Sequence, residues 1–186
     1  MRKKMNFIKT NIDGVIICEP RVFKDSRGYF FESYNEAEFK QNGIKNRFVQ
    51  DNQSKSSYGV VRGLHWQLGE HAQAKLVRVL QGKVLDVAVD VRPNSPTFGK
   101  HVAVELSAQN GRQLFIPRDF LHGFSVLSNQ AVFAYKCDNL YCKESEFGVA
   151  YNDPDVGVDW KVPEEHRILS EKDTKHPLLK NFDNPF

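Results

Sequence analysis

The middle of the chain is a series of short β-type stretches separated by turn residues. In one of these stretches, Val87, Val89 and Val91 alternate with Ala88 and Asp90. This is the period of a β-strand, because successive side chains of a strand point to opposite faces. Short strands at regular spacing, separated by turns, predict a β-sandwich or a barrel. The 14 Phe, 6 Tyr and 2 Trp of the chain also favour β-structure.

Three connections in this region contain typical turn residues. Gln81-Gly82 separates Lys75–Leu80 from Lys83–Arg92. Ala108-Gln109-Asn110-Gly111 and Ser128-Asn129 each stand between two further β-type stretches. We interpret both of these as hairpin connections.

Evidence for helices is limited to one short segment. Asn35 is a candidate N-cap for a helix through Phe39 and Lys40, which Gly43 would end. The C-terminal third is richer in Asp, Pro, Glu and Lys, so we expect loops there with one helix at most. With 186 residues and no internal repeat, the chain is expected to form a single domain over residues 1–186.

Composition excludes several classes of protein. The 26 Lys and Arg against 23 Asp and Glu leave a net charge of +3, too weak a bias to indicate a nucleic acid or an anionic membrane as partner. The chain has three cysteines, an odd number without Cys-x-x-Cys spacing: Cys18, Cys137 and Cys142. A disulfide framework or a structural zinc site is therefore not indicated, and we expect a cytoplasmic protein. No apolar run approaches the roughly 18 residues of a membrane span.

Polar residues inside β-type segments are the candidates for chemistry, because such side chains must be paired or face a cavity. In residues 60–67, strand alternation places His65 and Gln67 on one face, and Arg62 on the other unless the strand is bulged. His65 is a candidate general base or metal ligand, although Gln67 is a poor ligand for a transition metal. His122 offers one more nitrogen. Since neither histidine has an evident carboxylate partner, we favour acid–base chemistry over a metal site.

Other candidate residues have ordinary structural explanations when taken singly. Lys75 begins a strand about ten residues after His65, so the two could flank one cavity, but a lysine at a strand end is usually solvated. Tyr135 has the position of a core aromatic residue and is also a candidate proton donor. Arg27 follows Asp25 in typical turn chemistry, yet an arginine can also hold a phosphate bidentately.

Taken together, the motifs have a specific order. From about residue 7 to residue 180 they resemble the dTDP-4-dehydrorhamnose 3,5-epimerase family, and the ordered set is far more specific than any single motif. The matching segments are Phe30–Ser33, Phe48–Asn52, Arg62–Gln67, Gln73–Arg78, Asp86–Arg92, Ser95–Gly99, Leu106–Ala108 and His122–Phe124. The resemblance implies an all-β, jelly-roll (cupin-like) sandwich with a few short peripheral helices. It also implies a homodimer and no metal or organic cofactor.

The resemblance further implies a substrate and a set of roles. The substrate would be dTDP-4-dehydro-6-deoxy-D-glucose, whose ketone at carbon 4 acidifies the protons on carbons 3 and 5. His65 would be the base, oriented by Asp173, and Tyr135 the acid on the opposite face. Lys75 would stabilise the enolate. The positions matched to substrate binding are Arg27, Glu32, Gln50, Asp51, Asn52, Arg62, Lys75, His122, Tyr141, Glu146 and Lys172, with Tyr141 stacking on thymine.

Three alternatives remain at this point. A relative that inverts only one carbon, or one that uses another sugar nucleotide, would carry the same catalytic pair. A sugar 3,4-ketoisomerase would give a 3-keto product. A non-catalytic sugar-binding module of cupin shape would not need a matched base and acid. Two departures from the family pattern, Trp66 and the stretch 137–140, do not touch the expected chemistry.

Overall fold

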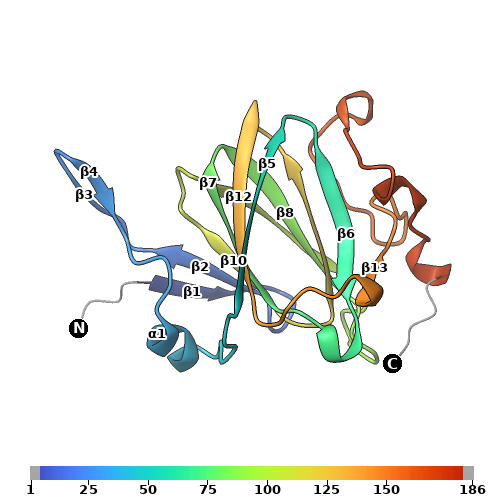
Figure 1. Ribbon diagram of the computed structural model, residues 1–186, viewed down its shortest axis with the longest axis horizontal. Coiled ribbons are helices and arrows are strands. Elements are labelled where there is room, and N and C mark those ends of the chain that lie inside the picture. The colour runs from blue at the N-terminus through green and yellow to red at the C-terminus, as the bar shows by residue number, and fades with distance from the viewer. Residues whose placement is uncertain (1–4, 182–186) are drawn as a thin grey trace.

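Two antiparallel sheets make up most of the computed structural model, which describes residues 5–181 (Figure 1). The ends of the expected domain, residues 1–4 and 182–186, lie outside the described residues. The six-stranded sheet has the order β1 (Met5–Lys9), β2 (Ile16–Pro20), β10 (Gln113–Ile116), β7 (Lys75–Gln81), β12 (Gln130–Cys137), β5 (Gln50–Ser57). The five-stranded sheet has the order β13 (Glu146–Gly148), β6 (Val61–Gln67), β11 (Phe120–Val126), β8 (Lys83–Asp90), β9 (His101–Ser107). The predicted β-sandwich is confirmed.

The two sheets face each other across a common apolar core. Val77 and Phe133 come from the six-stranded sheet, and Val104, Leu106 and Phe124 come from the five-stranded one. All five side chains are buried in one cluster. The alternation seen in the sequence therefore has its usual cause, because every second residue of these strands enters the core.

The hairpin interpretation of the connections is wrong. β9 and β10 flank residues 108–111, and β11 and β12 flank residues 128–129, but each pair divides between the two sheets. The same holds for β7 and β8 around Gly82. Alternation locates a strand without identifying its hydrogen-bonding partner, and a tight turn in a sandwich can carry the chain to the facing sheet. Consequently β6 and β7 present their side chains to the same interior from opposite sides.

Helices are few and short. The only α-helix among residues 5–181 is α1 (Glu36–Gln41), where the Asn35 side chain accepts a hydrogen bond from the backbone N–H of Glu38 at 3.2 Å. Gly43 follows with a positive φ of 93°, so the predicted cap and end of this helix are confirmed. The described C-terminal residues contain loops and 3-10 turns. The 3-10 turns of the chain are η1 (Gly69–His71), η2 (Lys143–Ser145), η3 (Glu164–His166), η4 (Asp173–Lys175) and η5 (Leu179–Asn181).

The C-terminal segment covers the outer face of the five-stranded sheet. The backbone N–H of Val61 donates to the Ile168 carbonyl at 2.9 Å, and that of Ala150 donates to the Pro177 carbonyl at 2.8 Å. Trp160 is fully buried in an apolar cluster between this segment and the sheet. These contacts bring η4 beside β6. Over residues 5–181, no helix combines the length and the apolar composition needed to cross a membrane.

Two strands, β3 (Phe23–Asp25) and β4 (Gly28–Phe30), form a separate hairpin that extends away from the sandwich (Figure 1). Arg27 lies in its turn, where the backbone N–H donates to Asp25 Oδ1 at 2.8 Å. The turn interpretation of Asp25 and Arg27 is therefore confirmed.

Candidate active site

A polar cavity of about 180 Å³ lies between the two sheets. It brings together three of the four predicted catalytic residues, which are His65 on β6, Lys75 on β7 and Tyr135 on β12. The complete lining consists of Gln53, Ser54, Arg62, His65, Lys75, His122, Gly123, Phe124, Phe133 and Tyr135. A sandwich core is normally apolar, so polar groups from facing sheets around one space indicate a site rather than ordinary packing.

Arg62 reaches the cavity because of an irregularity in strand β6. His65 is paired with His122 and Arg62 with Phe124, so three steps along β6 correspond to two steps along β11. This register shift changes the alternation of β6 between the two residues. Arg62 and His65 therefore line the same cavity, as the sequence predicted only for a bulged strand.

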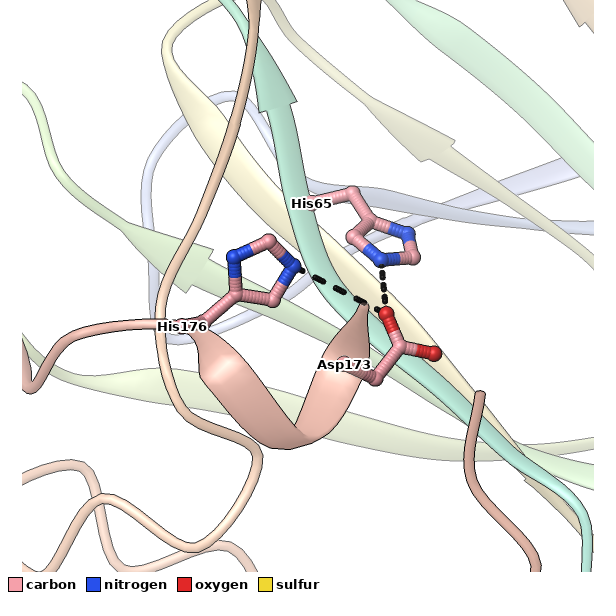
Figure 2. A group of neighbouring side chains, drawn as sticks. All are labelled: His65, Asp173 and His176. Atoms are coloured by element: carbon pink, nitrogen blue, oxygen red, sulfur yellow. Dashed lines mark hydrogen bonds and ion pairs between the residues drawn. The ribbon is translucent and has the colours of Figure 1, made fainter. Parts of the chain in front are cut away.

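The fourth predicted catalytic residue, Asp173, contacts His65 directly. Asp173 Oδ1 lies 2.5 Å from His65 Nε2, as Figure 2 shows. Asp173 is only 3% exposed, and burial alone would raise its pKa, but the hydrogen bond and charge of His65 outweigh burial and lower the pKa. The carboxylate is thus ionised near neutrality. If Nε2–H donates to Asp173, Nδ1 is the nitrogen of His65 left to accept a proton.

Lys75 and Tyr135 have shifted pKa values in the cavity. Burial lowers the pKa of the Lys75 ammonium, while the nearby Asp86 and Glu146 partly offset this effect. Burial also raises the pKa of the Tyr135 hydroxyl. Tyr135 therefore keeps its proton near neutral pH, as a proton donor must.

A second histidine–carboxylate pair lies at the cavity wall, and sequence analysis missed its acid. Asp86 on β8 is fully buried, and its Oδ2 lies 2.9 Å from His122 Nε2. Burial raises the pKa of Asp86 and lowers that of His122. Both histidines thus have a carboxylate partner: Asp173 for His65, as the family resemblance implied, and Asp86 for His122, which the sequence analysis did not indicate. An aspartate within an otherwise apolar buried strand was the available signal for this pair.

Five of the predicted binding residues form a connected group at the edge of the site. Gln50 Nε2 donates to Asn52 Oδ1 at 3.1 Å, and the backbone N–H of Tyr141 donates to Gln50 Oε1 at 3.0 Å. The Tyr141 hydroxyl donates to Glu146 Oε2 at 2.8 Å. This bond raises the pKa of Tyr141 to about 12. The same carboxylate oxygen lies 2.5 Å from Lys172 Nζ, and the Tyr141 ring remains 53% exposed.

Outside this group, Arg62, Lys75 and His122 line the cavity, and three predicted binding residues do not. Asp51 pairs with Lys136 at 2.9 Å and lines a neighbouring hollow, which shares Gln53 and Tyr135 with the cavity but lacks His65 and Lys75. Asp51 and Gln50 are successive residues of β5, so their side chains point to opposite faces of the sheet. Arg27 lies on the projecting hairpin, paired with Asp25 at 2.6 Å. Glu32 is half-buried in the segment between β4 and α1, and it does not line the cavity.

His176 is a further residue that sequence analysis missed. Its Nε2 lies 3.7 Å from Asp173 Oδ1, so His65, Asp173 and His176 gather three potential metal ligands within 4.8 Å (Figure 2). Two ligand atoms of one tetrahedral zinc ion, each about 2.1 Å from the metal, would lie about 3.4 Å apart. The 2.5 Å contact of His65 with Asp173 is instead a hydrogen-bond distance. The geometry favours a hydrogen-bonded pair over a metal centre.

The chain is similar to proteins of one family along nearly its whole length. A family model described as dTDP-4-dehydrorhamnose 3,5-epimerase matches residues 9–181. The dTDP-4-dehydrorhamnose 3,5-epimerase of Escherichia coli (strain K12) is 54% identical over 172 residues, covering 92% of this chain and 92% of that protein. The corresponding protein of Methanothermobacter thermautotrophicus is 51% identical over 180 residues, covering 96% of this chain and 97% of that protein.

Solved structures of similar proteins have the same fold as this chain. The dTDP-4-dehydrorhamnose 3,5-epimerase of Elizabethkingia anophelis NUHP1 superposes with a TM-score of 0.94 at 57% identity, covering 98% of this chain and 100% of that chain. A dTDP-6-deoxy-D-glucose-3,5-epimerase of Legionella pneumophila, in complex with dTDP-4-keto-L-rhamnose, has a TM-score of 0.92 at 50% identity. That match covers 96% of this chain and 95% of that chain. The expected cupin-like class of the sandwich is confirmed.

Removal of divalent metals is expected to leave turnover unchanged, because the His65–Asp173 contact has hydrogen-bond geometry and position 67 carries a glutamine. The measurement is the rate of substrate conversion before and after prolonged dialysis against a chelator. Activity that is lost on dialysis and restored by one divalent metal would contradict this expectation.

Proposed function

The chain belongs to the dTDP-4-dehydrorhamnose 3,5-epimerase family, and we propose an assignment of catalytic roles to the groups of its cavity. It is an isomerase of dTDP-L-rhamnose synthesis. It converts dTDP-4-dehydro-6-deoxy-D-glucose into dTDP-4-dehydro-L-rhamnose by inverting carbons 3 and 5. The observation that carries the assignment is that His65 and Tyr135 line one cavity from opposite sheets.

Inversion beside a ketone needs a base and an acid on opposite faces of the sugar. The proton is removed from one face, an enolate forms, and a proton is returned to the other face. His65 comes from the five-stranded sheet and serves as the base, with Asp173 stabilising the imidazolium that forms. Tyr135 comes from the facing six-stranded sheet and returns the proton. Because burial raises the pKa of Tyr135, its proton is retained until it is needed.

Lys75 stabilises the enolate oxygen in this scheme. Its ammonium lies in the cavity wall on β7, beside the strand that carries Tyr135 and in the sheet opposite His65. A fixed positive charge in a site with little water interacts strongly with the charge that develops during the reaction. The scheme uses proton transfers and one fixed cation, and it requires neither a metal nor an organic cofactor.

The nucleotide is held at the edge of the cavity. The exposed ring of Tyr141 offers a face on which thymine stacks, and its bond to Glu146 fixes the orientation of the ring. Gln50 and Asn52 support this residue from β5. Arg62, His122 and Lys172 supply the donors and cations that the diphosphate and the sugar need.

The protein acts as a homodimer in this proposal, and the β3–β4 hairpin is the element we assign to the contact. Phe23, Tyr29 and Phe30 of the hairpin are 45%, 65% and 69% exposed, and exposed aromatic side chains gathered on one small element are typical of an interaction surface. Arg27 in its turn cannot serve the cavity of its own chain from this position, so it would act at the partner's site. A solution mass of twice 21.4 kDa is the result expected from light scattering.

The protein is assigned to the cytoplasm and to a single folded domain. Cys18, Cys137 and Cys142 are all unpaired, and the first two are buried. Free thiols of this kind suit a reducing compartment.

Replacement His65→Asn is expected to abolish deuterium uptake at both carbon 3 and carbon 5, because asparagine has no usable basicity. Wild-type enzyme in heavy water should label both carbons of dTDP-4-dehydro-6-deoxy-D-glucose, as measured carbon by carbon by NMR. His166→Asn is the matched control, since His166 is an exposed histidine outside the cavity, and it should exchange like the wild type. If folded His65→Asn exchanges at the normal rate, the base lies elsewhere.

Replacement Tyr141→Ala is expected to weaken dTDP binding by roughly 5- to 150-fold, because stacking on an aromatic ring contributes about 1–3 kcal/mol per base. Tyr141→Phe keeps the ring and loses only the bond to Glu146, so its affinity should stay close to that of the wild type. Titration calorimetry with dTDP measures both variants. An unchanged affinity for the alanine variant would remove Tyr141 from the nucleotide site.

A further inference from the structure

The His176 ring lies next to the His65–Asp173 pair, in a space that the surrounding backbone leaves open. A Cβ atom added to Gly148 would lie 2.6 Å from two atoms of the His176 ring, so glycine at position 148 leaves the space that the ring fills. The next residue, Pro177, is held by the hydrogen bond from the Ala150 backbone. The His176 ring does not line the cavity, and it meets the His65 ring edge-on at a centroid distance of 5.6 Å.

The two histidine rings enclose one oxygen of Asp173. His65 Nε2 lies 2.5 Å from Asp173 Oδ1, and His176 Nε2 lies 3.7 Å from the same atom (Figure 2). The longer separation exceeds a hydrogen bond. His176 Nε2 is buried and has no hydrogen-bond partner within residues 5–181. At this separation the His176 ring makes no hydrogen bond to the carboxylate oxygen that His65 binds.

The charged groups around His176 are consistent with a neutral ring. Those that face it are His65 on β6, Asp173 and Lys172 at η4, and Glu146 on β13. Burial, followed by the charges of His65 and Lys172, lowers the pKa of His176, and Asp173 and Glu146 only partly oppose this. Near neutral pH the ring is therefore uncharged, so it does not compete with the imidazolium form of His65 as a cation for Asp173.

We propose that His176 is a positioning residue. It keeps other hydrogen-bond partners away from Asp173 Oδ1, so that this oxygen stays bonded to His65. The neutral ring covers Asp173 Oδ1, keeps water from it, and lies too far from it, at 3.7 Å, to make a hydrogen bond that would compete with His65. Asp173 Oδ1 is then hydrogen-bonded to His65 and not to His176, which orients the His65 imidazole and stabilises its protonated form. His176 touches no reacting atom and acts through Asp173 alone. The kinetic part of this proposal rests on the assignment of His65 as the base.

Three replacements of His176 distinguish the filling of space beside Asp173 from the donation of a hydrogen bond to it. His176→Leu fills the space with an apolar group and offers no donor, so it should behave like the wild type. His176→Ala admits water to Asp173 Oδ1, and His176→Gln places an amide N–H beside it. Both should weaken the hydrogen bond between Asp173 and His65 and make His65 a weaker base than in the wild type.

The weaker basicity expected for His65 in these variants determines the expected kinetic result. In His176→Ala and His176→Gln, the acid limb of the pH profile of kcat/KM should move to lower pH. A weaker base should also reduce kcat by roughly 3- to 10-fold, with KM unchanged, because His176 does not contact the substrate. A purely structural role for His176 would lower the melting temperature without moving the acid limb.

The deciding measurement is the titration of the His65 imidazole nitrogens by NMR in the wild type and the three variants. It reports the pKa of His65 whether or not His65 is the catalytic base, so this proposal and the catalytic assignment can fail separately. A lower pKa in His176→Ala and His176→Gln, with a wild-type pKa in His176→Leu, is the expected result. The same pKa in all four proteins, or an equal shift in all three variants, would overturn the proposal.

Discussion

The hydrogen bond between His65 and Asp173 is the interaction on which the site depends. It joins the central part of the chain to the C-terminal segment, 108 residues away in sequence, at 2.5 Å. Asp173 is buried and would resist ionisation, but its contact with His65 keeps its pKa low. Without that contact the imidazole would lose both its orientation and the charge that stabilises its protonated form. The backbone bonds of Ile168 and Pro177 serve this interaction, because they hold the segment that carries Asp173.

The sandwich itself explains why the cavity can perform an inversion. A sheet can present groups to only one side of a bound sugar, whereas two facing sheets present groups to both sides. His65 lies on β6, and Lys75 and Tyr135 lie on neighbouring strands β7 and β12 of the other sheet. The buried Asp86–His122 pair adds a second carboxylate near Lys75. That charge helps to keep the lysine protonated where burial would otherwise favour the neutral amine.

Much of the fold was predictable, and the pairing of strands was not. Alternating valines located β8, and Asn35 and Gly43 located α1, because these signals are local. Whether the chain at Gly111 turns back or crosses to the other sheet depends on long-range packing, which local pattern does not encode. For the same reason the side on which Arg62 lies depended on a register shift between β6 and β11.

In the site, too, some residues could be predicted from the sequence and others depended on contacts between distant parts of the chain. The sequence pattern made His65, Lys75 and Tyr135 candidates, and the resemblance to a known family implied their roles and added Asp173; the structure brings the first three together around one cavity. Asp86 could have been found from the sequence, since an aspartate inside an apolar strand requires a partner. His176 could not, because its significance comes only from Gly148 and Asp173, which meet it in space.

The central claim is that proton removal and proton return occur from opposite sheets, and Tyr135→Phe tests it most directly. With His65 and Lys75 intact, the enolate should still form, and it should be reprotonated from the face it left. Incubation in heavy water should then return starting material that carries deuterium at the first carbon attacked, without inversion there, as read by NMR. If the folded Phe variant, still able to bind dTDP, shows neither exchange nor inversion, Tyr135 has another role and the two-face account is wrong.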